Sequence, residues 1–322
     1  MRRVIPLLCS LLLLCSCGTG PSASAPEDSR RLVIFTARSA AVYDDAVREF
    51  ERRTGIWVEV RTADGTLPLL EQIAAGSSGC DLLLGAAPDS LSAYGGCFAP
   101  YAAPLAADIP DAYRDSEDRW TPFSLLPTVL VYNDQLVQRN VPDSWGDLIS
   151  VAWRGRIACP DPTVSATGCT ALQALLQALP GEEEAVLSVF SRNLDGVLPS
   201  AAAVVGAVAD GSCYVGVTTE DLALQAADSG LSISVIWPEE GAVIQPDCAA
   251  VVAGCAHEDN ARAFIDFLLS SEVQTRLAQQ FRRPIRGGGD LPPALPYDPY
   301  GAGAHQAELL AIWRSLTAED AA

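Results

Sequence analysis

Short apolar runs alternate with amphipathic stretches from about residue 30 onward. Leu32 to Thr36 has the composition of a buried strand, and apolar residues at helical spacing follow over Val42 to Phe50, ending at Gly55. The pattern continues with a strand over 57–61, a helix over 67–75 and a buried strand over 80–85. Strands that alternate with helices predict an α/β fold with a largely parallel sheet.

The second half of the chain repeats this alternation. We expect strands over 156–158, 213–217 and 232–237, with helices over 170–179 and 222–227. Two amphipathic helices follow over 259–269 and 272–281. The proline-rich stretch 292–299 is typical of a surface segment, and we expect a final helix over 308–316.

The first seventeen residues have the layout of a secretory signal. Arg2 and Arg3 precede an apolar run from Val4 to Leu14, which is too short to span a bilayer as a mature helix. Leu14-Cys15-Ser16-Cys17 resembles the bacterial lipobox, which makes Cys17 the acylated first residue of a lipoprotein; the alternative is an ordinary signal with Cys17 merely nearby. We therefore expect export, lipid anchoring and a location on the periplasmic or cell-surface face, with residues 18–30 as a flexible tether.

The amino-acid composition limits the classes of partner that the chain can bind. The net charge of −19 argues against nucleic acid and against anionic membrane surfaces. No later segment offers a long uninterrupted apolar run, so we expect no further membrane span. With 49% apolar residues, the chain can bury a substantial core. We expect the protein to be a monomer.

Several enzyme chemistries lack a necessary residue. All 21 basic residues are arginine, which excludes a Walker-type phosphate loop, a Ser-x-x-Lys nucleophile and a lysine Schiff base. His257 and His305 are the only histidines, and neither a Gly-x-Ser-x-Gly elbow nor a His-Glu-x-x-His zinc motif is present. We expect neither a catalytic site nor a cofactor, and we interpret His257 as a surface residue at a helix entrance.

Seven cysteines follow Cys17, and none has Cys-x-x-Cys spacing. They are Cys80, Cys97, Cys159, Cys169, Cys213, Cys248 and Cys255. In an exported protein some of them should pair, for which Cys248 and Cys255 are candidates, and the odd number leaves at least one free. We interpret them as structural and expect no metal site.

Several segments in order resemble the bacterial extracellular solute-binding proteins of the ferric-iron-transporter type. The most specific is the stretch Pro142 to Leu148 (PDSWGDL), followed by Trp153 to Ala158 (WRGRIA) and Asp161-Pro162. The other matching segments are Phe50–Ile56, Cys80–Leu84, Pro238–Gly241 and Ala261–Ser270. The resemblance covers about Leu32 to Arg286.

This resemblance implies a periplasmic-binding-protein-like fold of type II, with two α/β lobes and a ligand cleft between them. Crossover strands are expected near Phe123 to Val131 and near Val243 to Val252. Lobe 1 then comprises residues 31–125 and 243–322, and lobe 2 comprises residues 126–242. Closure of the lobes around a hinge is the expected motion.

In open parallel sheets, ligands bind beyond the carboxyl ends of strands, next to helix N-termini. Ser39 and the group Ser165–Thr167 place hydroxyls and backbone N–H groups at helix starts, which favour an anion, although each residue can also be a plain helix cap. Arg38 adds a guanidinium that can grip phosphate or carboxylate. The full set of candidate ligand-binding residues is Arg38, Ser39, Ala40, Ala86, Ser165, Ala166, Thr167, Thr219, Glu220, Asp221, Glu239 and Glu240.

The ferric members of the resembled family coordinate the metal with tyrosines, a histidine and a carboxylate, and here the match breaks. Ser39 occupies the histidine position and Ala86 the carboxylate position. Where a tyrosine pair would follow the strand over 213–217, the chain reads Thr218-Thr219-Glu220-Asp221. We therefore do not expect binding of naked ferric ion.

The remaining donors suit a phosphorylated sugar or a similar organophosphate. Hydroxyl and N–H groups would hold the phosphate, while Glu220, Asp221, Glu239 or Glu240 would accept hydrogen bonds from sugar hydroxyls; a solvated acidic rim is the alternative for these acids. The predicted function is a lipoprotein that delivers this solute to the permease of an ABC importer. The alternatives are uptake of ferric iron or a ferric chelate, an exported hydrolase, and a surface adhesin that reuses the fold.

Overall fold

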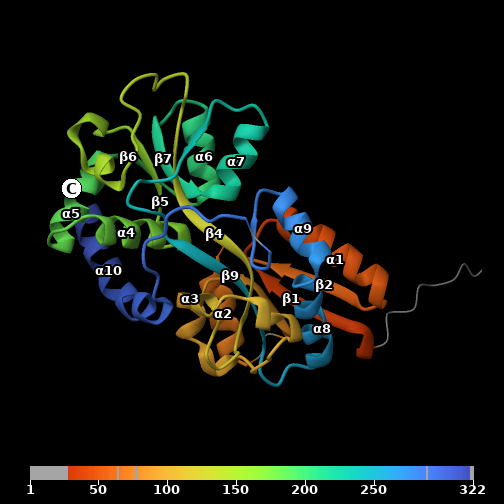
Figure 1. Cartoon of the computed structure of the whole chain (residues 1–322). Coiled ribbons are helices and arrows are strands. Elements are labelled where there is room, and N and C mark those ends of the chain that lie inside the picture. Colours follow the sequence, from red (N-terminus) through yellow and green to blue (C-terminus); the bar gives the residue numbers. More distant parts are fainter. Residues whose placement is uncertain (1–27, 64, 77–78, 288, 320–322) are drawn as a thin grey trace, which may run out of the picture.

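The computed structural model describes residues 28–319 apart from 64, 77, 78 and 288. Two lobes lie side by side, joined by two long strands that cross between them (Figure 1). The predicted signal, lipobox and most of the tether lie outside the described residues. In the part of the chain that is described, no helix has the length and apolar character needed to cross a membrane.

Lobe 1 is built on the parallel strands β1 (Arg31–Thr36), β2 (Trp57–Thr62) and β3 (Leu82–Ala86), in the order β2-β1-β3. Apolar side chains that alternate along β1 point to opposite faces, so Leu32 and Ile34 enter one core cluster while Val33 and Phe35 enter another. The helices of lobe 1 are α1 (Ala40–Thr54), α2 (Thr66–Ala74), α3 (Pro88–Ser92), α8 (Glu258–Leu268) and α9 (Ser271–Gln279).

Lobe 2 contains β5 (Ile157–Pro160), β6 (Leu194–Leu198), β7 (Val215–Thr219) and β8 (Ser234–Ile236). Its helices are α4 (Ala166–Ala178), α5 (Glu183–Asn193), α6 (Ala201–Ala209) and α7 (Glu220–Asp228). Trp145 and Leu148, from the most specific sequence segment, are fully buried in the main core of this lobe. Trp145 is therefore a packing residue of the lobe 2 core.

The crossover strands are β4 (Thr121–Tyr132) and β9 (Ile244–Val251), close to the expected ranges. The first half of β4 pairs with β9, and its second half, from Thr128, pairs with β7 and β8. One continuous sheet of order β2-β1-β3-β9-β4-β7-β5-β6 thus runs through both lobes. A rotation of one lobe relative to the other would therefore bend these strands.

The C-terminal segment corrects the predicted lobe boundary. After β10 (Arg283–Pro284), which pairs with β4, the chain forms α10 (Pro299–Glu319). Leu309 and Trp313 of α10 are fully buried in the core of lobe 2, where Trp313 packs against Phe190 of α5. The final helix therefore belongs with lobe 2, because its apolar face completes that core.

Short 3-10 helices connect the regular elements. They span Asp28–Arg30, Gly95–Cys97, Pro104–Asp108, Asp111–Tyr113, Trp145–Ile149 and Val151–Trp153. Five regular elements, α3, α5, β6, α6 and β10, were not predicted. The α6 sequence AAAVVGAVA is apolar on all sides, and β6 carries an aspartate and a glycine, so neither has a clear periodicity.

Two sequence interpretations need correction. All seven cysteines are free thiols, and Cys248 and Cys255 do not pair. His257 is not a surface residue, because its side chain is 10% exposed and its Nδ1 lies 2.8 Å from Oδ2 of the buried Asp81. The same carboxylate accepts the backbone N–H of Val33, so this pair ties the start of α8 to β1.

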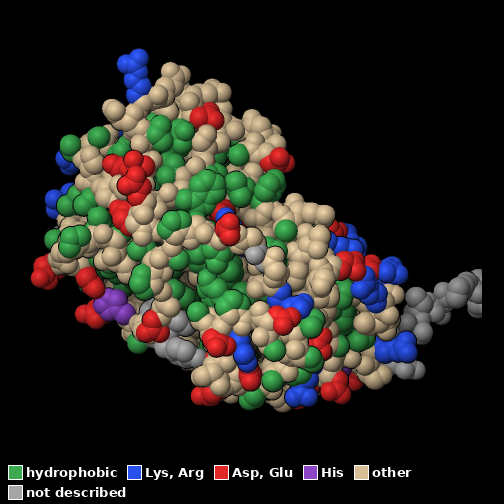
Figure 2. Space-filling view, in the orientation of Figure 1, with side chains coloured by type: hydrophobic (Ala, Val, Ile, Leu, Met, Phe, Trp, Pro, Cys, Tyr) green, Lys and Arg blue, Asp and Glu red, His purple; other side chains and the backbone are tan. Residues whose placement is uncertain are grey.

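The surface has a mixed charge pattern. Figure 2 shows basic and acidic side chains interspersed over α1 and α9, where Arg53 pairs with both Glu49 and Glu272. In this view, lobe 2 and the region around the crossover strands, which we call the hinge, show more apolar surface than α1 and α9 do.

Candidate functional site

Helix starts and strand ends from both lobes meet beside the crossover strands. Thr36 of β1 pairs with Leu84 of β3, which places the loop containing Arg38 and Ser39 next to Ala86. The loop before α2 reaches toward lobe 2, where a β-carbon on Gly65 would lie 3.8 Å from the carbonyl oxygen of Val164. The topological rule that selected these loops therefore locates the junction of the two lobes.

The Arg38 side chain packs against the end of β3 and binds Asp247 of the crossover strand β9. Gly85 has φ +86°, and a β-carbon there would lie 2.4 Å from Cγ of Arg38, so only glycine leaves room for this side chain. Arg38 Nη2 and Nε donate to Oδ1 of Asp247 at 2.7 and 3.3 Å. Burial alone would lower the pKa of Arg38, but the charge of Asp247 and the hydrogen bond with it raise that pKa overall.

Asp247 also binds a second arginine. Its Oδ2 accepts from Nη2 of Arg282 at 2.8 Å, and both side chains are buried. Nε of Arg282 lies 3.4 Å from Oδ2 of Asp221, which opens α7 in lobe 2. Asp221 Oδ1 accepts from the Thr219 hydroxyl at 2.5 Å. Two arginines and two aspartates therefore form one network that crosses from lobe 1 to lobe 2.

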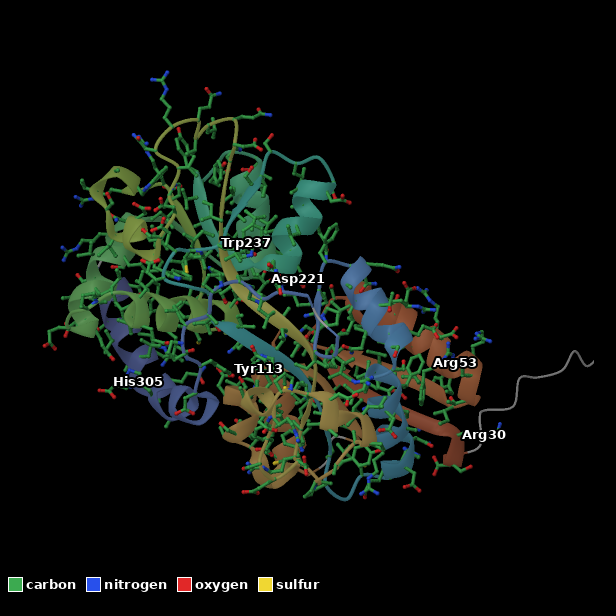
Figure 3. The ribbon with its side chains drawn as sticks, in the orientation of Figure 1. Arg30, Arg53, Tyr113, Asp221, Trp237 and His305 are labelled. Atoms are coloured by element: carbon green, nitrogen blue, oxygen red, sulfur yellow. The ribbon has the colours of Figure 1, made fainter. Side chains whose placement is uncertain are left out.

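Glu220 forms a second contact between the lobes. Its oxygens accept from Nε and Nη2 of Arg283 at 2.5 and 2.8 Å, and from the indole Nε1 of Trp237 at 2.7 Å. Asp221 and Trp237 lie close together at the base of the upper lobe (Figure 3). The prediction that Glu220 offers a free acceptor to a sugar is thus corrected, because Arg283 and Trp237 bind its carboxylate, while Asp221 accepts from Thr219 and lies beside Arg282.

The start of α4 retains the features expected of an anion site. Ser165 is the N-cap residue in an extended conformation, and its side chain makes no capping hydrogen bond. Ala166 is exposed, while Ser165 and Thr167 are half-buried. Their hydroxyls and the first N–H groups of α4 are arranged as a helix N-terminus that can receive a negatively charged group. Gly168 lets this turn approach β5, since a β-carbon there would lie 2.4 Å from the Pro160 carbonyl oxygen.

Ser39 and Ala40 give a similar helix start in lobe 1. Ser39 is the exposed N-cap of α1, again without a side-chain capping bond, and Ala40 is the exposed first residue of the helix. Ala86 is buried at the end of β3. Ala86 can therefore shape the wall of the site but offers no polar side chain.

The two glutamates after β8 have different positions. Glu240 is corrected to a structural role, because its carboxylate accepts the backbone N–H groups of Trp145 and Gly146 at 3.0 and 3.3 Å. Glu239 is exposed, and its own N–H donates to the Asp143 carbonyl.

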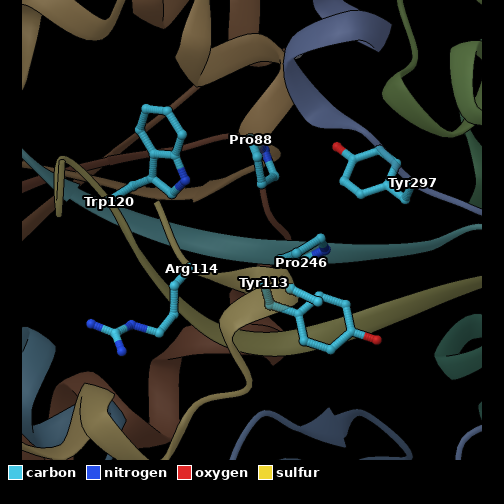
Figure 4. Close-up of a pocket in the computed structure, with 7 residues that line it drawn as sticks. Pro88, Tyr113, Arg114, Trp120, Pro246 and Tyr297 are labelled. Carbon is cyan, nitrogen blue, oxygen red and sulfur yellow. The ribbon is translucent and has the colours of Figure 1, made fainter. Parts of the chain in front are cut away.

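A small pocket lies beside the loop that follows β3. Pro88, Tyr113, Trp120, Pro246 and Tyr297 line it together with Ala112 and Arg114 (Figure 4). Its free volume of about 10 Å³ is room for a single water molecule. A ligand of sugar-phosphate size therefore does not fit this pocket.

Asp89, the next residue after Pro88, is a buried carboxylic acid. Its oxygens accept from the backbone N–H of Ser90 at 2.6 Å and from Nε2 of Gln245 at 3.1 Å. Burial nevertheless raises the pKa of Asp89 above its ordinary value, because these bonds only partly replace water.

Sequence reasoning missed Asp247, Arg282, Arg283 and Asp89. Asp247 had a usable signal, because it is a charged residue inside an apolar crossover strand and such a charge needs a partner. Arg282 and Arg283 follow the end of α9, and only the fold shows that they reach α7. Among the described residues, no group of three histidine, cysteine or acidic side chains is arranged to hold a metal ion.

The chain matches the family model described as "Bacterial extracellular solute-binding protein" over residues 91–302, about two thirds of its length. A relative from Salmonella typhi, named "Putative 2-aminoethylphosphonate-binding periplasmic protein", is 23% identical over 187 residues. That match covers 56% of this chain and 55% of the relative, so the chain spans about half the length of the curated relative.

Two solved structures share the fold. The ferric binding protein from Campylobacter jejuni superimposes with a TM-score of 0.78 at 20% identity, covering 88% of this chain and 99% of that one. The periplasmic binding protein AfuA from Actinobacillus pleuropneumoniae, solved with exogenous fructose-6-phosphate bound, gives 0.77 at 20% identity, covering 88% and 97%. With the two-lobed fold and the family match together, the chain belongs to the bacterial extracellular solute-binding proteins.

Proposed function

We propose that this chain is the solute-capturing subunit of an ABC importer and that its ligand is a small organic molecule with a phosphate or phosphonate group. The observation that carries the proposal is the start of α4, where the Ser165 hydroxyl is not used for capping and the preceding residue, Val164, lies next to Gly65 of lobe 1. Such a helix start binds oxyanions through N–H donors and the helix dipole. The Salmonella relative and the AfuA structure, named for a phosphonate and a sugar phosphate, support this ligand class.

Capture would proceed by bending β4 and β9. The anionic group would bind at Ser165, Ala166 and Thr167 in lobe 2, and the remainder of the solute would face Ser39 and Arg38 in lobe 1. Closure then buries the solute between lobes, and the closed form is presented to the permease.

The test is a titration of the mature domain with 2-aminoethylphosphonate, fructose 6-phosphate and inorganic phosphate, followed by calorimetry and thermal unfolding. At a hundred times its Kd, a ligand stabilises the native state by about 2.7 kcal/mol. Thr167→Ala and Ser165→Ala should weaken binding, whereas Ser315→Ala, an exposed serine on α10, should not. If none of the three probes binds, the proposed ligand class is wrong.

A second candidate is ferric iron or a ferric chelate, favoured by the likeness to ferric binding proteins. A citrate-like anion could use the same hydroxyl and N–H donors, whereas Ser39 and Ala86 supply no anionic metal ligand. Binding of ferric citrate, but of none of the phosphorus compounds, would favour this candidate. Turnover of a phosphate ester would instead favour the exported hydrolase.

The lipid anchor is a separate part of the proposal. Acylation of Cys17 would hold the protein at the outer face of a membrane, within reach of the permease. Mass spectrometry of the N-terminal peptide from the native protein tests it, with Cys17→Ala as the unmodified control.

A further inference from the structure

Arg282 is a buried cation with unused donors. Its side chain is 2% exposed and makes one close hydrogen bond, from Nη2 to Asp247. Nε and Nη1 have no hydrogen-bond acceptor. Three partly exposed arginines, Arg31, Arg262 and Arg286, have a buried Nε without an acceptor, but within the described residues only Arg282 has a buried terminal nitrogen without one. Buried donors without acceptors are costly, which points to a group that this arrangement receives in another state.

A second unsatisfied group lies next to it. Ser124 of β4 is the cross-strand partner of Asp247 and also pairs with Pro284 of β10, two residues from Arg282. The Ser124 side chain is fully buried, and its Oγ has no hydrogen-bond partner. The β-carbons of directly opposed residues lie about 5 Å apart, so Ser124 and Asp247 occupy neighbouring positions on the same face of the sheet.

The cluster is connected to the cleft through Arg38. Arg38 binds the other oxygen of Asp247, its side chain is 28% exposed, and it precedes Ser39 at the start of α1. Lobe 1 and the hinge thus contribute two positive charges and one negative charge. Asp221, from lobe 2, supplies the second negative charge.

The contact with Asp221 is loose. Nε of Arg282 lies 3.4 Å from Oδ2 of Asp221 without forming a hydrogen bond, and Oδ1 of Asp221 is directed to the Thr219 hydroxyl. If the lobes separated, Asp221 would move away with α7 and one positive charge would be left uncompensated. Nε and Nη1 lie on different edges of the guanidinium, so an oxyanion aligned with one edge can satisfy one of these donors, which a misaligned carboxylate does not.

We propose that Arg38, Arg282 and Ser124 form an anion-recognition site at the hinge, and that Asp221 occupies the place of the ligand's oxyanion when no ligand is bound. This inference rests on the proposed function, since it requires the lobes to open and to close on an anionic solute. The hinge site would be a second anchoring point for the solute, in addition to the start of α4. It therefore predicts a solute with an anionic oxygen group that reaches the hinge.

Two variants should change the affinity for the probe in opposite directions. Arg282→Gln removes the receiving guanidinium and should weaken binding of the best probe at least tenfold. Asp221→Asn keeps the side-chain size but removes the competing charge, so it should tighten binding severalfold. Arg48→Gln removes one exposed arginine of α1, whose side chain is 68% exposed, and should leave the Kd unchanged. The measurement is calorimetric titration with 2-aminoethylphosphonate, fructose 6-phosphate and inorganic phosphate, together with circular dichroism of each variant.

The outcomes separate the two proposals. If the wild type binds a probe and both variants bind it with the wild-type Kd, the hinge site is wrong and the proposed function stands. If the wild type binds none of the probes, the proposed ligand class fails and the hinge site fails with it. Should Arg282→Gln not fold, Asp221→Asn decides alone, because tighter binding supports the site and unchanged or weaker binding overturns it.

Discussion

The carboxylate of Glu240 accepts the backbone N–H of Trp145, 95 positions earlier in the chain, at 3.0 Å. It also accepts the N–H of Gly146, while the indole Nε1 of Trp145 donates to the carbonyl of Gly241 at 2.9 Å. The turn after β8 is therefore fastened to the 3-10 helix that carries the buried Trp145. A residue that sequence reasoning placed among the ligand acceptors instead organises the core of lobe 2.

Glu240→Ala should destabilise the protein by about 1–3 kcal/mol, because it leaves two N–H donors without their charged acceptor. Ligand affinity should not change, since the carboxylate is directed at the protein backbone. Urea unfolding and calorimetry together check this expectation. The matched control is Glu239→Ala at the exposed neighbouring position, which should stay within about 0.5 kcal/mol of the wild type. A loss of affinity in a fully folded Glu240→Ala variant would return Glu240 to the ligand site.

Gly168→Ala should damage both stability and binding. The new β-carbon would lie 2.4 Å from the Pro160 carbonyl oxygen and 2.7 Å from the Pro162 nitrogen, and both are backbone atoms that cannot move aside independently. The start of α4 must shift away from β5, at a cost of about 1–3 kcal/mol, and it carries Ser165 with it.

Gly206→Ala on α6 is the control for Gly168→Ala. It has open space around the new β-carbon and should be neutral or slightly stabilising, since alanine favours the helix. Thermal unfolding and calorimetric titration of both variants are the measurements. An unchanged Kd for Gly168→Ala would show that the start of α4 does not bind the solute.

Much of the fold could be predicted because its main elements have clear periodicity. The strand over 32–36 and the helix ending at Gly55 are observed as β1 and α1, with Gly55 left-handed at φ +67°. The two crossover strands were also expected close to where they are observed, because the resemblance to the solute-binding family implied them. The α10 helix was assigned to the wrong lobe, because the sequence shows its apolar face but not which core that face completes.

The candidate site was predictable only in part. Strand ends and helix starts follow from local sequence, so Ser39 and the start of α4 were placed where helices begin. The arginines that bind Glu220 and Asp221 come from about 60 residues away in the chain. No local pattern connects them, and pairing of buried charges depends on how the lobes pack.

Asp89 should make the protein less stable as pH rises through the acidic range. Burial raises the pKa of Asp89 above its ordinary value of 3.8, so the native state retains this proton to a higher pH than the unfolded chain does. The protonated carboxyl therefore favours the native state below about pH 3.8, and this contribution is lost as pH rises through the native pKa. Asp89→Asn removes the titration and should gain stability relative to the wild type as pH increases.

The measurement for Asp89 is urea unfolding at intervals from pH 4 to pH 8. Asp111→Asn, at a fully exposed carboxylate, is the control and should follow the wild-type curve. A constant difference between Asp89→Asn and the wild type over this range would mean that Asp89 does not titrate differently in the native state.

Trp313 should prove essential to lobe 2, although it lies on the last helix. Its side chain is 1% exposed and its ring lies 6.3 Å from that of Phe190, centroid to centroid. Trp313→Ala would leave a large cavity between α10 and α5, and we expect a loss of about 3–5 kcal/mol. Arg314→Ala, at the exposed next position of the same helix, should be close to neutral. Urea unfolding measures both, and limited proteolysis should release α10 from the Trp313→Ala variant first. A loss below about 1 kcal/mol would show that α10 is peripheral to the lobe 2 core.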